Sequence, residues 1–277
     1  MNIPECLQFV KNKLTPVSGD SALSEAEQIM EEVLKCSRSD LYLSFNALLF
    51  KNQQKEIEAI VERRKRHEPL PYIFNRAYFH SRSFYVDKSV LIPRPETEVL
   101  VETILASEKK PYCLFLDLGI GSGAISSILA MEKPLWHGIG SDVSTAALRI
   151  AKRNCGGNVW MLNADGFSAF KLVSRFDFIV SNPPYISAVE MAGLDPSVKD
   201  FEPRIALFGG EDGLDFYRKI ISNAHLYLES GGYLILEMGF GQHVKVRKIL
   251  QNSLNFEIID VLKDYNNIDR VIVAKNR

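Results

Sequence analysis

Residues 113–123 read CLFLDLGIGSG, a nearly continuous apolar run that ends in a loop with three glycines. An apolar run this short is typical of a strand that is buried on both faces of a parallel sheet. Glycines after such a strand remove the Cβ atoms that would keep the backbone away from a ligand. The crevice beyond the carboxyl ends of parallel strands is where open α/β sheets bind ligands. This segment therefore predicts a central strand of such a sheet and a ligand site at its end.

The rest of the C-terminal region continues this pattern. Helical patterns alternate with short apolar runs, and the runs lie at 137–142, 158–165, 176–184 and 233–239. This alternation predicts an α/β fold with helices on both faces of a parallel sheet. Residues 256–275 instead predict two strands joined by a polar turn around Asn266 and Asn267. A closing antiparallel pair fits the Rossmann-like sheet of a class I methyltransferase better than a dehydrogenase domain.

Residues 1–72 have a different character. Apolar residues recur there at helical spacing, for example at Leu7, Val10, Leu14, and later at Leu41 and Phe45. This periodicity predicts a small bundle of helices that pack on one another, because helices this short are not stable alone. We interpret the bundle as a separate N-terminal domain.

A connector is expected between the two regions. Residues 73–95 alternate aromatic or β-branched residues with polar ones, and Asp87-Lys88-Ser89 resembles a turn. The alternation predicts a β-hairpin. Residues 96–277 then form the catalytic domain.

Composition narrows the class of protein. The 277 residues are 46% hydrophobic and 24% charged, with a net charge of −1. A near-neutral balance argues against nucleic acid as the main partner. The four cysteines form no CxxC pair and no Cys/His cluster occurs, so we expect reduced thiols and no metal site. The chain contains no apolar stretch long enough for a membrane span and begins without a secretory signal, so we expect a cytoplasmic protein.

The ends of three predicted strands offer groups for a cofactor. The glycine loop spans Asp117-Leu118-Gly119-Ile120-Gly121, Asp142 closes the next strand, and Asp165-Gly166 closes the third. An acidic residue placed like Asp142 can accept hydrogen bonds from both ribose hydroxyls. Together these groups suit an adenosine pocket, and the GxGxG spacing differs from the dinucleotide pattern GxGxxG. Each aspartate alone could instead be a helix cap or a turn residue.

Asn182-Pro183-Pro184-Tyr185, after the fourth strand, suggests the reaction. An amide nitrogen is a poor nucleophile, but a site can accept both of its N–H hydrogens on fixed oxygens, here the side chain of Asn182 and the carbonyl of Pro183. The prolines stiffen the backbone, and Tyr185 would lie over the amide and near a sulfonium. The tetrapeptide could otherwise be only a rigid turn, because Asn-Pro commonly begins turns.

At these residues the sequence resembles the HemK/PrmC family. LIPRPETEVLVE (91–102), DLGIGSGAIS, VSNPPYI, FEPRIALFGGEDGLDFYRKI and GGYLILEMG occur in the family's order. The resemblance implies that S-adenosyl-L-methionine is the cofactor. It also implies that a glutamine in the Gly-Gly-Gln motif of class 1 peptide-chain release factors is methylated at N5.

The family's functional positions map onto two sets of residues. The cofactor positions correspond to Asp117 through Gly121, Asp142, Gly166 and Asn182, and the substrate positions to Asn182 through Tyr185, among which we expect Asn182, Pro183 and Tyr185 to act in catalysis. Ile120 replaces a usual threonine, Gly166 replaces a larger side chain, and Phe74-Asn75 lies where a glycine is frequent.

Three alternatives remain open from the residues. An N6-adenine methyltransferase acting on DNA or RNA needs the same oxygen acceptors, and Arg63-Arg64-Lys65-Arg66-His67 is the one dense basic run. We interpret that run as a solvated helix face. A binding module without activity and a nicotinamide oxidoreductase are the other two. We also expect Glu202 and Arg204 to form an ion pair near the site.

Overall fold

The computed structural model describes residues 1–43, 47–172 and 175–277, so the expected helical position at Phe45 lies outside the described residues. The chain divides into two compact units. One contains Met1–Arg76 with Pro196–Phe201, and the other contains Ala77–Asp195 with Glu202–Arg277. No helix in the described ranges is both long enough and apolar enough to cross a membrane.

The first unit is helical, as the periodicity predicts. Its main helices are α1 (Ile3–Ser18), α2 (Ala22–Leu34), α3 (Arg38–Leu43) and α4 (Lys51–Arg64), with the 3-10 turn η1 (Gly19–Ser21) between the first two. Asn2 and Glu5 cap α1 reciprocally, each accepting the other's backbone N–H at 2.9 Å. Val10, Leu14, Ile29 and Met30 are fully buried in its core. The unit thus has a hydrophobic core of its own.

Two short helices complete this unit. Pro71 lies in the single turn α5 (Leu70–Ile73), where a proline in the first turn loses no hydrogen bond. The other is α10 (Pro196–Lys199). The long helix α4 has already ended at Arg64.

A β-hairpin begins the second unit, but its turn is not where the sequence predicts it. Strands β1 (Ala77–Phe79) and β2 (Arg82–Phe84) are joined at His80 and Ser81, whose φ angles are 49° and 57°. A turn does form at Asp87-Lys88-Ser89, where the Val90 N–H donates to the Asp87 carbonyl at 3.1 Å, but it follows the hairpin and does not join its strands. His80 and Ser81 are not the Asn-Gly or Asp-Gly residues that usually mark a two-residue hairpin turn, so the sequence gives no clear signal for the turn there.

The main sheet has seven strands: β3 (Leu114–Leu118), β4 (His137–Asp142), β5 (Val159–Asn163), β6 (Phe176–Ser181), β7 (Leu228–Glu237), β8 (Phe256–Lys263) and β9 (Asp269–Asn276). Their order is β5-β4-β3-β6-β7-β9-β8. Pairing is parallel through β7, and β9 is antiparallel to both of its neighbours. The predicted Rossmann-like sheet with an antiparallel closing pair is confirmed.

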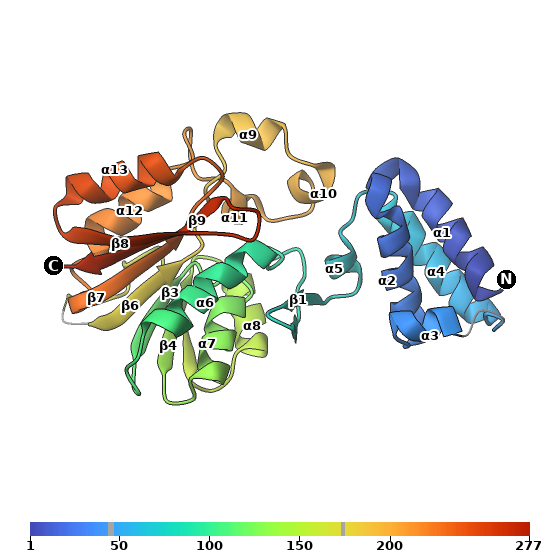
Figure 1. The fold of residues 1–277 in the computed structure, drawn as a ribbon, viewed down its shortest axis with the longest axis horizontal. Coiled ribbons are helices and arrows are strands. Elements are labelled where there is room, and N and C mark those ends of the chain that lie inside the picture. The colour runs from blue at the N-terminus through green and yellow to red at the C-terminus, as the bar shows by residue number, and fades with distance from the viewer. Residues whose placement is uncertain (44–46, 173–174) are drawn as a thin grey trace. The chain divides into compact units, whose positions relative to one another are not determined.

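Helices cover both faces of this sheet (Figure 1). On one face lie α6 (Glu98–Ser107), α7 (Ala124–Glu132) and α8 (Thr145–Asn154), and on the other lie α12 (Asp215–Ala224) and α13 (His243–Ser253). Successive strand residues point to opposite faces. Phe115 therefore belongs to the core under α6 and α7, and Leu116 to the core under α12 and α13.

Between β6 and α12 the sequence predicts only a loop, and the structure adds short helices. These are α9 (Ala188–Ala192) and α11 (Arg204–Leu207), with α10 between them in sequence; the 3-10 turn η2 (Pro95–Thr97) precedes α6. Single turns like these are too short for periodicity to predict.

Candidate active site

A pocket of about 360 Å³ opens at the carboxyl ends of β3, β4, β5 and β6. Of the predicted cofactor residues, it is lined by Leu118, Gly119, Ile120, Gly121, Asp142, Gly166 and Asn182. Of the predicted substrate residues, it is lined by Asn182, Pro183 and Pro184. Asp117 and Tyr185 do not line it. The structure therefore brings both predicted sets of residues to one cavity, apart from these two side chains.

The glycine loop has the backbone shape that its composition suggests. Gly119 and Gly121 have φ angles of 75° and 54°, and a Cβ on Gly119 would meet nothing within 4 Å. Gly123, with φ of 80°, has a different reason to lack a side chain, because its Cβ would lie 2.8 Å from Cys155 Sγ. The first two glycines thus keep the pocket wall open, while the third allows α7 to pack closely.

Ile120 ties this loop to the neighbouring strand. The backbone N–H groups of Gly119 and Ile120 both donate to the carbonyl of Ser141, at 2.8 and 3.0 Å. The Ile120 side chain is 5% exposed and covers Gly140, whose Cβ would lie only 2.0 Å from Ile120 Cδ1. Ile120 therefore holds the loop against β4 through its side-chain packing as well as through its backbone hydrogen bond.

Asp142 supports the loop from the end of β4. Its Oδ2 accepts from the Gly121 N–H at 3.0 Å, and its Oδ1 accepts from the Ser144 N–H at 2.9 Å. The cap of α8 is Ser144, whose Oγ accepts from the Ala147 N–H, so Asp142 is not a helix cap. Burial raises the pKa of Asp142, although the backbone hydrogen bonds oppose the rise.

Asp117 lies beneath the loop. It is 1% exposed, and its Oδ2 accepts from Ser126 Oγ at 2.7 Å on α7. Its Oδ1 is buried without a hydrogen-bond partner among the residues that the structure describes. Burial raises its pKa to about 7, the hydrogen bond from Ser126 opposes this, and the charge of Asp142 adds to it. The Asp117 side chain thus contacts the first turn of α7 and does not line the pocket.

The end of β5 differs from the expectation of a free carboxylate. Asp165 forms an ion pair with Lys219 of α12, with 2.5 Å between Oδ1 and Nζ. Gly166 has a φ of 59°, and its Cβ would lie 3.2 Å from Lys219 Cε. The space left by the missing side chain at residue 166 is therefore bordered by a lysine that the sequence analysis did not identify.

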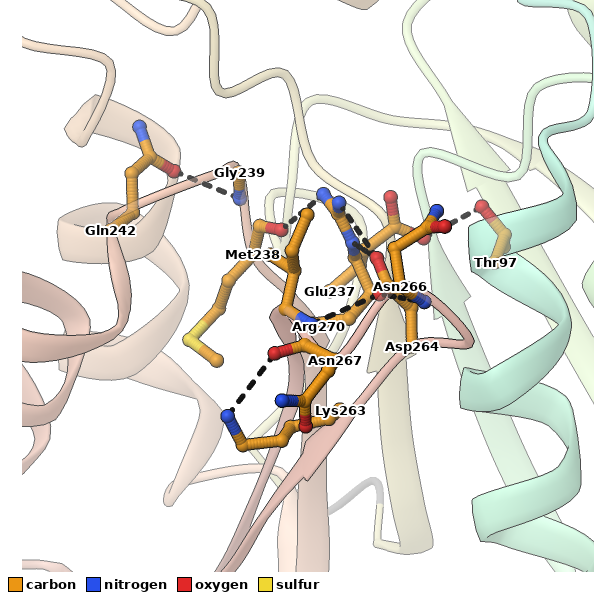
Figure 2. Close-up of polar contacts among 11 residues, drawn as sticks. Thr97, Glu237, Met238, Gly239, Gln242, Lys263, Asp264, Asn266, Asn267 and Arg270 are labelled. Carbon is orange, nitrogen blue, oxygen red and sulfur yellow. Dashed lines mark hydrogen bonds and ion pairs between the residues drawn. The ribbon is translucent and has the colours of Figure 1, made fainter.

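Asn182 directly follows β6 and has partners that the sequence analysis missed. Its Nδ2 donates to Thr97 Oγ1 at 3.1 Å, and Thr97 Oγ1 donates to Glu237 Oε2 at 2.6 Å. Figure 2 shows the second of these contacts, with Thr97 at the start of α6 and Glu237 at the end of β7. An acidic residue inside the apolar run YLILEMG was the one available signal.

The backbone after Asn182 is held from behind. Gln242 Nε2 donates to the carbonyl of Tyr185 at 2.8 Å, and a Cβ on Gly209 would lie 2.7 Å from the carbonyl oxygen of Pro184. Tyr185 itself is partly buried and packs against the core under α12 and α13. Burial raises the pKa of its hydroxyl.

The expected ion pair between Glu202 and Arg204 is not formed. Glu202 pairs with Arg94 and accepts from the Ile92 N–H at 3.4 Å, while the Arg204 guanidinium lies 5.0 Å from the ring centre of Phe208. Arg94 precedes η2, so the pair ties the segment before α6 to the loop after β6. Burial raises the pKa of Glu202, and Arg94 opposes that rise.

A second buried pair anchors the closing strands next to Glu237 (Figure 2). Arg270 on β9 donates to Asp264 Oδ2 at 3.1 and 3.0 Å and to the carbonyl of Met238 at 3.0 Å. Asp264 Oδ1 in turn accepts from the N–H groups of Asn266 and Ile268. The predicted turn between the last strands is therefore joined to the end of β7.

The contact between Gly140 and Ile120 can be tested by substitution. We expect Gly140→Ala to displace Ile120 and its loop, and to weaken binding of S-adenosylmethionine, the cofactor implied by the sequence, by about tenfold or more. The matched control is Gly138→Ala on the same strand, whose Cβ would meet the ring of Phe115 at 2.4 Å in the core. Calorimetric titration of both folded variants measures the difference. Equal affinities in the two would contradict this account of the loop.

The architecture agrees with solved methyltransferases. A methyltransferase from Pyrococcus furiosus aligns with a TM-score of 0.50 at 16% identity, covering 82% of this chain and 98% of its own. The 16S rRNA N2 G1207 methyltransferase of T. thermophilus, in complex with AdoMet and guanosine, aligns with a TM-score of 0.50 at 20% identity, covering 73% of this chain and 50% of its own. At these identities the agreement concerns the fold alone.

Two family descriptions match separate parts of the chain. The PrmC N-terminal domain matches residues 5–74, and the methyltransferase small domain matches residues 95–193. The two matches fall on the helical bundle and on the part of the sheet that carries the glycine loop and Asn182.

Curated relatives match over nearly the whole length. A release factor glutamine methyltransferase of Thermodesulfovibrio yellowstonii is 41% identical over 260 residues, covering 91% of this chain and 92% of its own. Those of Geobacter sulfurreducens and Bacillus cereus are 37% and 33% identical, covering 98% and 99% of this chain and 95% and 99% of their own. The chain therefore belongs to the release factor glutamine methyltransferase family.

Proposed function

We propose that this protein transfers a methyl group from S-adenosyl-L-methionine to N5 of the glutamine in the Gly-Gly-Gln motif of class 1 release factors. The observation that carries the proposal is the placement of Asn182. Its side chain lines the same pocket as the glycine loop, and its Nδ2 is engaged by Thr97. The amide oxygen is thereby left as an acceptor. Family membership supports glutamine as the acceptor residue.

Methylation of an amide nitrogen depends on hydrogen-bond acceptors that orient its N–H groups more than on a general base that removes a proton first. The cofactor supplies an electrophilic methyl group when it is bound. Asn182 Oδ1 and the carbonyl of Pro183 would accept the two N–H hydrogens of the glutamine amide, which leaves its lone pair to attack the methyl group. The N–C bond would form as the bond between the methyl carbon and sulfur breaks, and the nitrogen would then lose one N–H proton to water. The two prolines fix the backbone that carries these oxygens. Most of the acceleration would then come from holding the nitrogen about 3–3.5 Å from the methyl carbon.

The pocket fits the proposed cofactor. The open Cβ position of Gly119 lets backbone approach a ligand, and residues Leu118 to Gly121 would hold its amino acid part. Asp142 keeps lone pairs for the ribose hydroxyls after accepting two backbone N–H groups. The space at Gly166 would take the adenine ring. Asp117 would support the loop from below.

We assign Tyr185 a supporting role in place of the expected contact with the glutamine amide. Its ring lies outside the pocket lining, and its carbonyl is held by Gln242. Fixing the chain directly after Pro184 limits how far the two acceptor oxygens can move. Tyr185 would thus act on the reaction through Pro183 and Asn182.

The adenine methyltransferase alternative gains no support from the basic run. Arg64 pairs with Glu25, Arg63 with Glu68, and Lys65 with Glu62. Arg64 is in fact buried at 8% exposure, so the interpretation of the run as a solvated face is wrong for this residue. Cations that are already paired contribute little to binding phosphate.

We further propose that the helical bundle, residues 1–72, recognises the release factor, and that the protein acts in the cytoplasm where such substrates occur. Leu48 and Phe50, in the chain just before α4, are 75% and 72% exposed. Two large apolar side chains this exposed, two residues apart in sequence, are candidates for a protein contact.

The reaction is tested by transfer of labelled methyl to purified release factor. Asn182→Ala should lower turnover by about 10²-fold or more, because the nitrogen is no longer positioned, while cofactor affinity stays within a few-fold. A release factor with alanine in place of the Gly-Gly-Gln glutamine and a duplex DNA serve as controls. Label on DNA, or undiminished turnover of Asn182→Ala, would contradict the proposed function.

The recognition role of the bundle is tested with the double variant Leu48→Ser, Phe50→Ser. We expect the KM for release factor to rise about fivefold or more, since each exposed apolar contact stabilises binding modestly, with the affinity for S-adenosylmethionine unchanged. The matched control is Leu254→Ser, at a residue 73% exposed in the other unit. The recognition role would be refuted by an unchanged KM in the double variant.

A further inference from the structure

Three polar side chains form a short chain that runs from the pocket wall into the protein interior. Asn182 Nδ2 donates to Thr97 Oγ1, and Thr97 Oγ1 donates to Glu237 Oε2. Thr97 is 5% exposed and Glu237 is 1% exposed, so the contact between these two residues is shielded from water. The three residues come from the loop after β6, the turn η2 and the end of β7. Residues this far apart in sequence are brought together only by the fold.

The direction of the hydrogen bonds follows from counting protons. A threonine hydroxyl has one proton to donate, and an ionised carboxylate can only accept. When Glu237 is ionised, Thr97 must give its proton to Glu237 and can only accept from Asn182. The NH₂ end of the Asn182 amide must then face Thr97. The single proton of the Thr97 hydroxyl therefore fixes the orientation of the Asn182 amide.

We propose that Thr97 and Glu237 are positioning residues that keep the amide oxygen of Asn182 directed at the acceptor nitrogen. The inference rests on the proposed function, in which that oxygen accepts an N–H of the glutamine. A reversed amide would present its own NH₂ to the glutamine NH₂, and two donors cannot bond to each other. Thr97 reaches the pocket wall beside Asn182, whereas Glu237 lies behind it and does not line the pocket, and in this proposal both act through Asn182.

The surroundings of Glu237 show why its charge matters. Arg270 on β9 attracts it, Glu96 in η2 repels it, Thr97 donates a hydrogen bond to it, and the nearby Tyr185 side chain also favours its charged form. Its own backbone carbonyl accepts from the Tyr217 hydroxyl at 2.9 Å, which holds the end of β7 in place. Burial outweighs the favourable partners and raises the pKa of Glu237 to about 7. The residue can therefore change its charge near neutral pH.

The sign of the pH effect follows directly. When the pH falls below its pKa of about 7, Glu237 gains a proton and becomes a hydrogen-bond donor to Thr97. The Thr97 hydroxyl is then free to donate to Asn182 Oδ1, which favours the reversed amide. Turnover at saturating cofactor should fall as pH drops through this range and reach a plateau above it.

The first experiment removes the hydroxyl. In Thr97→Val we expect kcat for release factor methylation to fall by about tenfold or more, with the KM for release factor and the cofactor affinity within about threefold, because only orientation is lost. Thr97→Ser keeps the hydroxyl and should restore most of kcat. The matched control is Thr103→Val, at a buried threonine of α6 whose hydroxyl donates only to the Val99 carbonyl.

The second experiment removes the titrating group. Glu237→Gln should lack the acid limb that the wild type shows near pH 7, and its kcat should be lower at pH 8 by about tenfold. Asp117 also has a pKa of about 7, so an acid limb that persists in Glu237→Gln would assign it to Asp117 and overturn the inference. Thermal unfolding of each variant confirms that it is folded.

The outcomes separate the inference from the function on which it rests. If wild type transfers no methyl group to release factor, the proposed function fails. If wild type is active and Thr97→Val matches Thr103→Val in kcat, only the positioning role fails. If Thr97→Val does not fold, Thr97→Ser and Glu237→Gln still test the positioning role. If Glu237 had only a structural role, the pH profile of Glu237→Gln would be like that of wild type.

Discussion

The site depends on the position of β3 in the sheet. This strand pairs with β4 on one side and with β6 on the other. After β3 the chain continues to β4 on one side of the pair, and after β6 it continues to β7 on the opposite side. A crevice at the carboxyl ends is the geometric consequence of such a change in strand order. The glycine loop comes from one side of this crevice and Asn182 from the other. The two sets of residues therefore lie at the ends of neighbouring strands, and a methyl donor and an acceptor nitrogen bound to them would be close together.

The groups that sequence analysis found are those with a local signature. A glycine loop after an apolar strand, an aspartate at a strand end and an Asn-Pro-Pro-Tyr run each occupy a few neighbouring residues. The structure brings all three to one pocket, except for the side chain of Tyr185. Lys219 and the pair of Thr97 with Glu237 have no such signature, because 54 and 140 residues separate the partners. These contacts form only when helices and strands that are distant in sequence pack together, and no periodic pattern in the sequence predicts that packing. Asp117 shows the converse, since a prominent motif residue lies under the loop instead of in the pocket wall.

The errors in the fold prediction have the same origin. The hairpin was expected from alternation, which says that strands exist but not where they turn, and the turn uses His80 and Ser81 at positive φ. Glu202 was expected to pair with its sequence neighbour Arg204 and pairs instead with Arg94, across more than 100 residues. In both places local pattern was outweighed by contacts that only the folded chain makes.

Two buried carboxylates lie behind the two halves of the pocket, and each opposes stability at neutral pH. Asp117 and Glu237 have pKa values of about 7, far above those of carboxylates in an unfolded chain. Between pH 4 and 7 the folded protein holds these protons while the unfolded chain has released them, so the free energy of unfolding declines as pH rises. Apolar residues at both positions would avoid this loss of stability. They could not, however, accept a hydrogen bond from Ser126 on α7 or from Thr97 beside Asn182. The two carboxylates are therefore best explained by the orientation of the groups above them, which is the kind of local conflict with stability that functional sites retain.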